Sequence, residues 1–550
     1  MYTYLEIESE IRKDLEKAGF KNAKIEKPPE GICAYFSIPC FQYAAEMKKA
    51  PHMVAVEAAK HIRASGIVKE IKVVGAYVNV YVDKKIFAKK VVSDIIKKEE
   101  KYGSLDEKGK VIMDVFQPNT HKAFHIGHLR NAILGESIRR ILSFSGKKPV
   151  AVSYMGDIGA HVAKWIWYYT KFYKGKIPKK DVSKWAGEIY TKATFKVDEN
   201  KEKYEKEIHE IHLKLEERDP KLTKIWKDTR KLCIDAISVV QKELDVHLDD
   251  AIYESEVEMP GKEIVIGCQK KMPKVIKKSE GAVIVDLEKY NLGVFVLLKS
   301  NGATLYSTKD IGLADMKNRK FGRYDESLFI VAVEQEHHFR QLFKTLELIG
   351  MKNYEKNHHI SYGLVKLADA KMSSRLGNIV LYEDVRDKMK ENIGDVVAEK
   401  NPSLAGKKEV IDIIALGAIK YSMLNHDTVK TITFSWDRAA DFEGNSGPYL
   451  QYSYARSKSL LRKSGCKKIC YFELLSKLCN EEADLIEKMS EFPVAVSHAA
   501  SEYSPHIITN YLYSLAKIYS RFYNDVPVLK AEQKTKMFRL SLVAAYCIVM

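Results

Sequence analysis

The sequence predicts an α/β protein, with a Rossmann-type parallel-sheet catalytic domain between an N-terminal α/β module and a C-terminal all-helical domain. Apolar runs typical of buried strands alternate with helical patterns through the middle of the chain. A polar, glycine-containing stretch at 97–110 precedes them, and from about 382 onward the pattern is almost wholly helical. We therefore expect domains at 1–104, 105–381 and 382–550.

The first module alternates helical and strand patterns. We expect a helix from about Leu5 to Ala18, a strand in ICAYFSIP at 32–39, a helix ending at Gly66, and strands in IKVVGAYVNVYVD at 71–83. These segments predict a small α/β module.

The catalytic domain begins with VIMDVF at 111–116, a short run that suits a buried strand. A loop, QPNTHKAFHI, leads into a helix that runs through Phe144 and is stopped by Gly146. A highly charged helical insertion is expected near 175–250. Further strands, expected to extend this unit into one parallel sheet, are PVAVSYM at 149–155, AVIVDL at 282–287, VFVLLK at 294–299 and LFIVAVE at 328–334.

Composition favours a cytoplasmic protein with a polyanionic partner. The chain has no run of about 18 apolar residues, and its N-terminus is charged rather than signal-like. Eight cysteines show no paired spacing, so we expect free thiols and no metal site. Lys and Arg exceed Asp and Glu by 90 − 73 = 17, which favours binding to phosphates, although a merely lysine-rich surface is the alternative. The last residues, 538–550, stop inside an apolar helical pattern, so we expect a truncated C-terminus.

Two histidines flank a glycine where the first sheet strand gives way to a helix, in FHIGHLRNA at 124–132. A helix N-terminus offers free N–H groups and a positive dipole end, which suit phosphate. His125 and His128 lie near one face of the first turn, where both can donate hydrogen bonds to phosphate oxygens in a transition state. Gly127 lets a flat ring such as adenine approach, and Lys122 adds positive charge. Histidines that merely cap a helix are the alternative.

A second candidate phosphate loop is KMSSRLGN at 371–378, after the last expected sheet strand. It is small and polar, and it contains glycine and two basic residues, so it can close over a triphosphate. Taken alone it is typical of a surface turn. The two motifs in this order, on either side of one α/β sheet, together indicate a nucleotide site.

These motifs resemble the HIGH and KMSKS signatures of the class I aminoacyl-tRNA synthetases. The sequence around the first motif, FQPNTHKAFHIGHLRNAILGESIRRIL, resembles the version of this motif found in arginyl-tRNA synthetases. Three further stretches are similar to that family: SYMGDIG at 153–159, in which the family's Asn, His and Trp are replaced, LYSTKDIG at 305–312 and FEGNSGPYLQYSYAR at 442–456. The resemblance covers nearly the whole chain.

The resemblance implies an ATP-dependent arginine–tRNA ligase. The carboxylate of L-arginine would attack the α-phosphate of ATP, pyrophosphate would leave, and a terminal ribose hydroxyl of the tRNA would take the arginyl group. Catalysis would combine positioning with charge stabilisation. The expected partners are ATP with its Mg²⁺, L-arginine and the tRNA for arginine, with no membrane, and we expect a monomer.

Catalytic and ATP-binding roles follow by matching positions. The catalytic group comprises His125, His128, Lys122 and Lys371, and the ATP-binding group comprises Gly127, Met372, Ser373, Ser374 and Arg375. The family pattern has its second lysine where this chain has Ser374. We expect Lys122 to supply that charge, with Arg375 as the rival.

The arginine pocket is also assigned by resemblance. A guanidinium is a planar cation whose donors seek carboxylates in fork geometry. Asp310 would take it while Tyr306 flanks the side chain. Asp114 and Asn119 would hold the α-amino and carboxylate ends, and Gln335 would complete the pocket, unless the match is out by one position and Glu334 does so.

Contacts with tRNA are less localised. The 102 residues from Tyr449 contain ten tyrosines interleaved with Lys and Arg, which suits base stacking, although most such aromatics are core. By resemblance the helical domain reads the anticodon and the first module the tRNA elbow. The candidate residues are Asn79, Tyr449, Gln451 and Arg456.

Other interpretations remain open. The chain could be a synthetase for another amino acid, although it lacks zinc cysteines and room for an editing domain. It could be a nucleotidyltransferase that acts without RNA, or a catalytically inactive RNA-binding relative. Glu334, Glu336, His337 and His338 could form a metal site, but adjacent histidines point in different directions on a helix.

Overall fold

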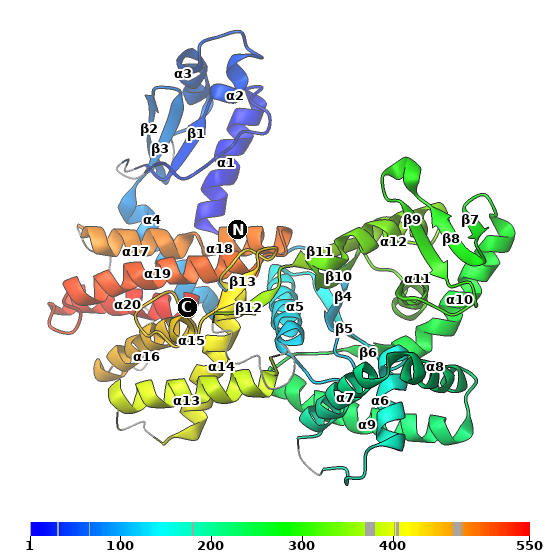
Figure 1. Ribbon diagram of the computed structural model, residues 1–550. Helices are drawn as coiled ribbons and strands as arrows, with labels where there is room; N and C mark the ends of the chain where they lie inside the picture. Colours follow the sequence, from blue (N-terminus) through cyan, green and yellow to red (C-terminus); the bar gives the residue numbers. More distant parts are fainter. Residues whose placement is uncertain are drawn as a thin grey trace. The chain divides into compact units, whose positions relative to one another are not determined.

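A computed structural model describes residues 2–29, 32, 34–64, 66–178, 181–368, 380–400, 402, 406–465, 475 and 477–550. It divides the chain into two compact units (Figure 1). Unit 1 contains Met1–Leu105, Tyr449–Ala499 and Ile507–Met550, and unit 2 contains Asp106–Pro448 and Ala500–His506.

Unit 1 combines the N-terminal module with helices from the end of the chain. Its sheet is antiparallel, in the order β1-β3-β2. The elements of the N-terminal part are α1 (Thr3–Lys17), β1 (Phe36–Pro39), α2 (Phe41–Ala44), α3 (Pro51–His61), β2 (Val68–Val74), β3 (Tyr77–Val82), α4 (Lys84–Lys98) and a 3-10 turn, η1 (Glu99–Lys101). The C-terminal helices are α16 (Gly447–Lys463), α17 (Asn480–Ser490), α18 (Phe492–Ser501), α19 (Pro505–Asp525) and α20 (Gln533–Val549).

The two parts of unit 1 share one hydrophobic core. On α1, Ile7, Ile11 and Leu15 are spaced four apart and bury one stripe, as an amphipathic helix requires. Helix α4 contacts both α17 and α20. The Tyr102 hydroxyl donates to the Met489 carbonyl at 3.3 Å. Segments almost 400 residues apart in sequence are therefore stabilised together.

Unit 2 is built on a five-stranded sheet in the order β11-β10-β4-β5-β6, with every neighbouring pair parallel. Along β4, Val111, Met113 and Val115 face one core while Ile112 faces another, so the sheet is covered on both sides. This confirms the predicted Rossmann-type architecture.

The elements of unit 2 follow in chain order. The first group is β4 (Lys110–Phe116), α5 (Ile126–Ser145), β5 (Lys148–Met155), α6 (Ala160–Lys171), α7 (Val182–Glu199), α8 (Lys201–Glu216), α9 (Pro220–Glu243), β6 (Asp250–Tyr253), α10 (Glu254–Lys271), β7 (Ile276–Ser279), β8 (Ala282–Asp286), η2 (Glu288–Tyr290) and β9 (Val294–Leu298). The second group is α11 (Tyr306–Phe321), β10 (Glu326–Ala332), η3 (Val333–Gln335), α12 (Glu336–Leu348), η4 (Tyr354–Lys356), β11 (Asn357–Tyr362), β12 (Val365–Leu367), α13 (Tyr382–Lys400), α14 (Lys408–Leu424), β13 (Ile432–Phe434) and α15 (Trp436–Ala439).

Two of the expected sheet strands were wrong. AVIVDL and VFVLLK form β8 and β9, which belong to a separate antiparallel sheet, β7-β8-β9. Buried and more exposed positions alternate along them, so only one face is covered, as is typical of antiparallel strands. The parallel sheet instead takes β6, which has only four residues, and β11, whose sequence NHHISY is mostly polar, so neither was recognised as a buried strand.

The segment 382–448, expected within the helical domain, lies in unit 2. Helices α13 and α14 pack on α5, and β13 pairs in parallel with β12, with Val365 opposite Ile432. The sequence pattern is helical, but its apolar faces are buried against unit 2.

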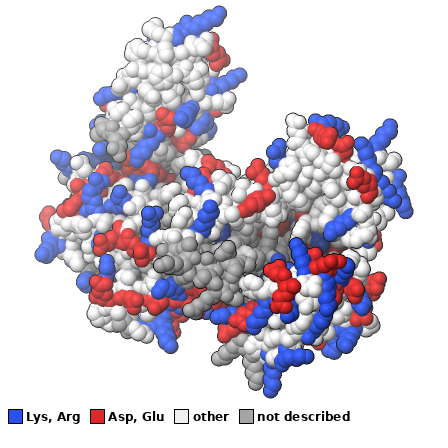
Figure 2. Space-filling view, viewed as in Figure 1, with Lys and Arg blue, Asp and Glu red and all other residues white. Residues whose placement is uncertain are grey.

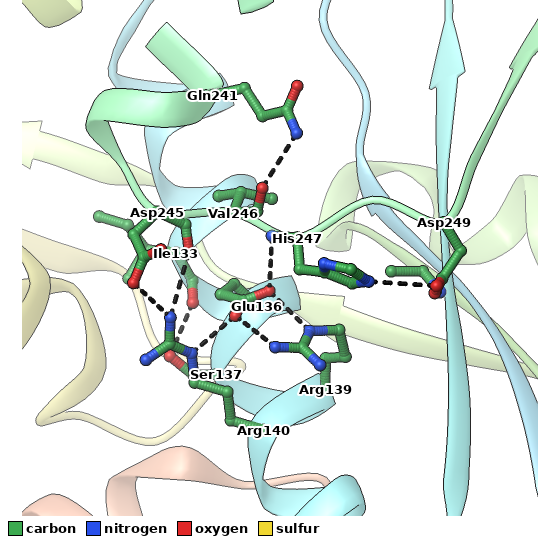
Figure 3. Close-up of polar contacts among 11 residues, drawn as sticks. Ile133, Glu136, Ser137, Arg139, Arg140, Gln241, Asp245, Val246, His247 and Asp249 are labelled. Atoms are coloured by element: carbon green, nitrogen blue, oxygen red, sulfur yellow. Dashed lines mark hydrogen bonds and ion pairs between the residues drawn. The ribbon is translucent and has the colours of Figure 1, made fainter.

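Helix α5 is anchored at its middle by a buried carboxylate (Figure 3). Glu136 accepts two hydrogen bonds from Arg139 at 2.8 Å and one from Arg140 at 2.6 Å, and it also accepts from the backbone N–H of His247 at 3.2 Å. Arg140 also pairs with Asp245 at 2.6 Å. Burial raises the pKa of Glu136, but the two arginines lower it further, so the net pKa lies below its usual value. The helix is thereby fixed to the loop after α9.

No helix in the described parts of the chain is long and apolar enough to cross a membrane.

Candidate functional site

A cleft of about 660 Å³ opens in unit 2, beyond the carboxyl ends of the sheet strands. Ligands in open α/β sheets bind at this edge. The cleft brings together nine of the residues that the sequence analysis singled out, from segments more than 200 residues apart: Asp114, Asn119, Lys122, His125, Gly127, His128, Tyr306, Asp310 and Gln335.

The two histidines cap helix α5. Backbone N–H groups of Gly127 and His128 donate to His125 Nδ1 at 3.1 and 3.3 Å, and the N–H of His125 donates to His128 Nδ1 at 3.4 Å. The rings stack with centroids 3.8 Å apart. Because each Nδ1 accepts, each neutral ring carries its proton on Nε2. Both Nε2–H groups are therefore left as donors for a ligand.

Burial keeps both rings neutral. Burial and Lys122 lower the pKa of His125 to about 4. Burial, His125 and Lys122 lower the pKa of His128 well below its usual value. The pair is thus a fixed set of neutral donors at physiological pH rather than a proton shuttle. A Cβ on Gly127 would lie 2.9 Å from the His125 ring, so glycine keeps this arrangement possible.

Lys122 is held by the helical insertion. Its Nζ lies 5.3 Å from the ring centroid of Tyr190 on α7. Helix α7 reaches the loop because Gly187 has no side chain; a Cβ there would lie 2.5 Å from that of Ala123. Burial and Lys164 lower the pKa of Lys122, and Glu254 opposes this. The insertion therefore forms the wall that positions this lysine.

The KMSSR stretch, with Lys371, Met372, Ser373, Ser374 and Arg375, lies outside the described residues. Both of its flanks lie against the cleft. Gly363, Leu364 and Val365 line it before the stretch. After the stretch, the Val380 carbonyl accepts from the N–H of Ile126 at 2.9 Å, beside the histidine pair.

The carboxylate predicted to bind a guanidinium is already partnered. Asp310 contacts His338 Nε2 on α12 at 2.7 Å, and both side chains are less than a quarter exposed. Tyr306 is 70% exposed at the rim. Gln335 and Glu334 both line the cleft, so the two alternatives for that position remain open.

Asp114 and Asn119 lie deeper. Lys317 Nζ, fully buried, donates to Asp114 Oδ2 at 2.7 Å, while Asp114 Oδ1 has no hydrogen-bond partner among the described residues. Burial raises the pKa of Asp114 and lowers the pKa of Lys317, and their mutual attraction opposes both shifts. A Cβ on Gly156 would lie 2.2 Å from Asn119 Oδ1, so glycine allows this approach.

Sequence reasoning missed several polar residues of the cleft. Glu254, the first residue of α10 and directly after β6, pairs with Lys309 at 2.7 Å, and both are more than nine-tenths buried. Because β6 was not recognised as a strand, Glu254 directly after it was not identified as a candidate site residue. The other missed polar residues are Gln117, Arg130, Asn131, Tyr154 and Tyr362, whereas His338 was named only as a possible metal ligand.

The candidate tRNA-binding residues lie in unit 1. Asn79 is 1% exposed within β3, which argues against direct contact with tRNA. Arg456 donates to Ser520 at 3.0 Å and lies 4.1 Å from the Tyr523 ring centroid. Tyr449 packs near Tyr513 with ring centroids 5.7 Å apart, whereas Gln451 is partly buried on α16. More accessible aromatics on the same helix are Tyr452, 53% exposed, and Tyr454, 39% exposed.

The face shown in Figure 2 carries no single patch of positive charge, because Lys and Arg lie among Asp and Glu over both units. Within the described ranges, no group of three or more His, Cys, Asp or Glu side chains could hold a metal ion.

Family models cover most of the chain. The catalytic domain of class I tRNA synthetases (R) matches residues 91–436. The DALR anticodon-binding domain matches 450–550, and the arginyl-tRNA synthetase N-terminal domain matches 5–82.

Whole-chain relatives agree. An arginine–tRNA ligase of Halothermothrix orenii is 35% identical over 95% of this chain and 92% of its own length. One of Clostridium perfringens is 34% identical with the same coverage. The solved arginyl-tRNA synthetase of Thermus thermophilus superposes with a TM-score of 0.86 at 25% identity, covering 100% of this chain and 97% of that one. The chain therefore belongs to the arginyl-tRNA synthetase family, the class I arginine–tRNA ligases.

Proposed function

We propose that the unit 2 cleft is the site where this arginine–tRNA ligase forms arginyl-adenylate and transfers the arginyl group to tRNA. The observation that carries this is the pair of Nε2–H donors at the start of α5, set in one cleft with the carboxylates Asp114, Asp310 and Glu254. The donors suit an anionic nucleotide, and the carboxylates suit a cationic amino acid.

On the phosphate side, His125 and His128 would donate to oxygens that gain charge as arginine attacks the α-phosphate. Fixed donors of this kind need no reorganisation during the reaction. Lys122 would stabilise the departing pyrophosphate in place of the lysine that Ser374 replaces. Its position on the loop before His125, braced by Tyr190, supports this assignment over Arg375. Lys371, Met372 and Ser373 would close over ATP, and Mg²⁺ would enter with ATP as its counter-ion.

On the amino-acid side, the buried charges favour a cation. Asp114, Asp310 and Glu254 bring three negative charges, and Lys309 and Lys317 offset two of them. Of these three carboxylates only Asp310 is not paired with a lysine, which leaves it as the candidate partner for the positive side chain of arginine. Asp310 would receive the guanidinium beside Tyr306, and the free Oδ1 of Asp114 would receive the α-ammonium. Asn119 would bind the carboxylate end, and Gln335 or Glu334 would close the pocket.

The remaining assignments are coarser. The DALR helices of unit 1 would bind the anticodon region through Tyr449, Gln451 and Arg456. The N-terminal module would bind the elbow through its exposed residues rather than through the buried Asn79. We further propose a cytoplasmic monomer. Light scattering of the purified chain should then give a mass near 62.8 kDa, and a mass near twice that value would contradict the monomer.

The test is arginine-dependent ATP–pyrophosphate exchange with tRNA present. His125→Ala combined with His128→Ala should lower the exchange rate by about 100-fold or more, as loss of preorganised donors does. His209→Ala, on the exposed face of α8, is the matched control and should retain the wild-type rate. Wild-type exchange in the double variant would place the reaction elsewhere.

Asp310→Asn distinguishes arginine binding from ATP binding in the cleft. It keeps the shape but removes the charge, so KM for arginine should rise while KM for ATP stays within about twofold. An unchanged KM for arginine would exclude Asp310 as the guanidinium partner. Charging of total tRNA with other amino acids provides the specificity control.

A further inference from the structure

Arg130 is a buried cation in the cleft without a counter-charge. It lies on α5, five residues after His125, and is only 1% exposed. Its Nη2 donates to the Thr428 carbonyl at 3.3 Å. Its Nε and Nη1 are buried with no hydrogen-bond partner in the part of the chain that the structure describes.

Among the described residues of unit 2, the other two buried cations, Lys309 and Lys317, are paired. Lys317 contacts Asp114 at 2.7 Å and Lys309 contacts Glu254 at 2.7 Å, and even the partly buried Arg230 contacts Asp157 at 2.6 Å. Among the described residues, Arg130 forms no ion pair with a carboxylate. The hydroxyl of Tyr362 is the nearby group that favours its charge.

An unpaired guanidinium at this depth is costly. Buried polar groups without partners destabilise a fold, and a buried charge does so more strongly. Burial lowers the pKa of Arg130 to about 10, and Tyr362 opposes this, so the group stays charged at neutral pH. Its free Nε–H and Nη1–H groups can bind an oxyanion that enters the cleft.

We propose that Arg130 is a substrate-binding residue that takes up an oxyanion of the activation reaction. That oxyanion is either a phosphate of ATP or the carboxylate of arginine, which share the chemistry that a guanidinium recognises. The inference rests on the proposal that this cleft holds both substrates. In activation a carboxylate approaches a phosphate, so two anions must come together. A fixed cation beside them reduces their repulsion at the site where the bond forms.

Arg130→Met and Arg130→Lys test the assignment, with Arg319→Met as the matched control. Arg319 is 57% exposed on α11 and lies outside the cleft lining. The exchange assay would give kcat and KM for arginine, ATP and pyrophosphate, together with Ki for agmatine. Agmatine is arginine without its carboxylate, so it isolates that group.

If Arg130 binds the carboxylate, Arg130→Met should raise KM for arginine by about 10- to 100-fold, the range for a charge-assisted hydrogen bond. Ki for agmatine and KM for ATP should not change. If it binds phosphate, KM for ATP or pyrophosphate should rise by a similar factor while arginine and agmatine are unaffected. Arg130→Lys, which keeps the charge but loses the fork, should recover part of either loss, and it alone tests the idea if the Met variant does not fold.

The proposal is overturned if both variants keep kcat and every KM within about twofold of wild type. It is also overturned if agmatine binding weakens as much as arginine and ATP binding, because that pattern indicates a distorted cleft. The double histidine variant is assayed alongside. Wild-type exchange in the double histidine variant would refute the assignment of the reaction to this cleft. If that variant loses exchange while both Arg130 variants keep wild-type kinetics, only the role of Arg130 is refuted.

Discussion

Replacing Lys317 with Met should leave Asp114 as an uncompensated carboxylate in the interior of unit 2. Both side chains are at most 1% exposed, and Lys317 Nζ lies 2.7 Å from Asp114 Oδ2. Removing one partner of a buried pair typically costs about 3–5 kcal/mol. The variant can relieve part of this cost by protonating Asp114. The loss in the free energy of unfolding therefore cannot exceed the cost of that protonation.

The upper limit on this loss of stability follows from the pKa of an exposed aspartate. Burial already raises the pKa of Asp114, and losing Lys317 removes the charge that opposed this shift. With an unfolded pKa of about 3.9, neutralising the carboxylate costs about 4 kcal/mol at pH 7 and about 2 kcal/mol at pH 5.5. A group with a raised folded pKa contributes stability below its unfolded pKa and loses it as pH rises. The destabilisation should therefore be larger at pH 7 than at pH 5.5.

Urea unfolding followed by tryptophan fluorescence measures this loss in the correct unit, because all five tryptophans lie in unit 2. Lys320→Met is the matched control on the same helix; its pair with Asp250 is partly exposed and should contribute at most about 1 kcal/mol at either pH. KM for arginine should also rise in Lys317→Met, since a protonated Asp114 cannot pair with an ammonium. A loss below about 1 kcal/mol, or one that is equal at both pH values, would refute this reasoning.

Two further outcomes follow from the walls of the cleft. Gly187→Ala should lower the exchange rate by about 10- to 100-fold, because a Cβ 2.5 Å from that of Ala123 must displace the loop that carries Lys122; an unchanged rate would show that α7 does not position this lysine, and Gly267→Ala, where nothing lies within 4 Å, is the control. The exchange rate should show no histidine titration between pH 5.5 and 8, because burial and Lys122 lower the pKa of His125 to about 4. The stability linked to its neutral ring is complete above the unfolded pKa of about 6.5 and is lost as pH falls toward 4, so a step in the rate near pH 6.5 that disappears in His125→Ala would contradict the assignment.

The helix predicted after the loop QPNTHKAFHI is present as α5, because the patterns that predict a helix start and end depend on neighbouring residues. His125, Gly127 and His128 lie within one helical turn, so the cap geometry follows from their spacing. The same holds for the end of α5 at Gly146, whose φ of 103° suits glycine. The family motifs were recognisable for the same reason, since each is a continuous stretch.

What the sequence by itself determined was the alternation of strands and helices, the turn at the start of α5 and the family. Only the tertiary structure decided which strands share a sheet: β8 and β9 read as core strands but pair antiparallel elsewhere. It also decided that Lys317 lies under Asp114, that His338 contacts Asp310, and that Arg130 is buried without a counter-charge among the described residues. Strand pairing and buried charge depend on contacts between segments far apart in the chain, and no local periodicity encodes those contacts.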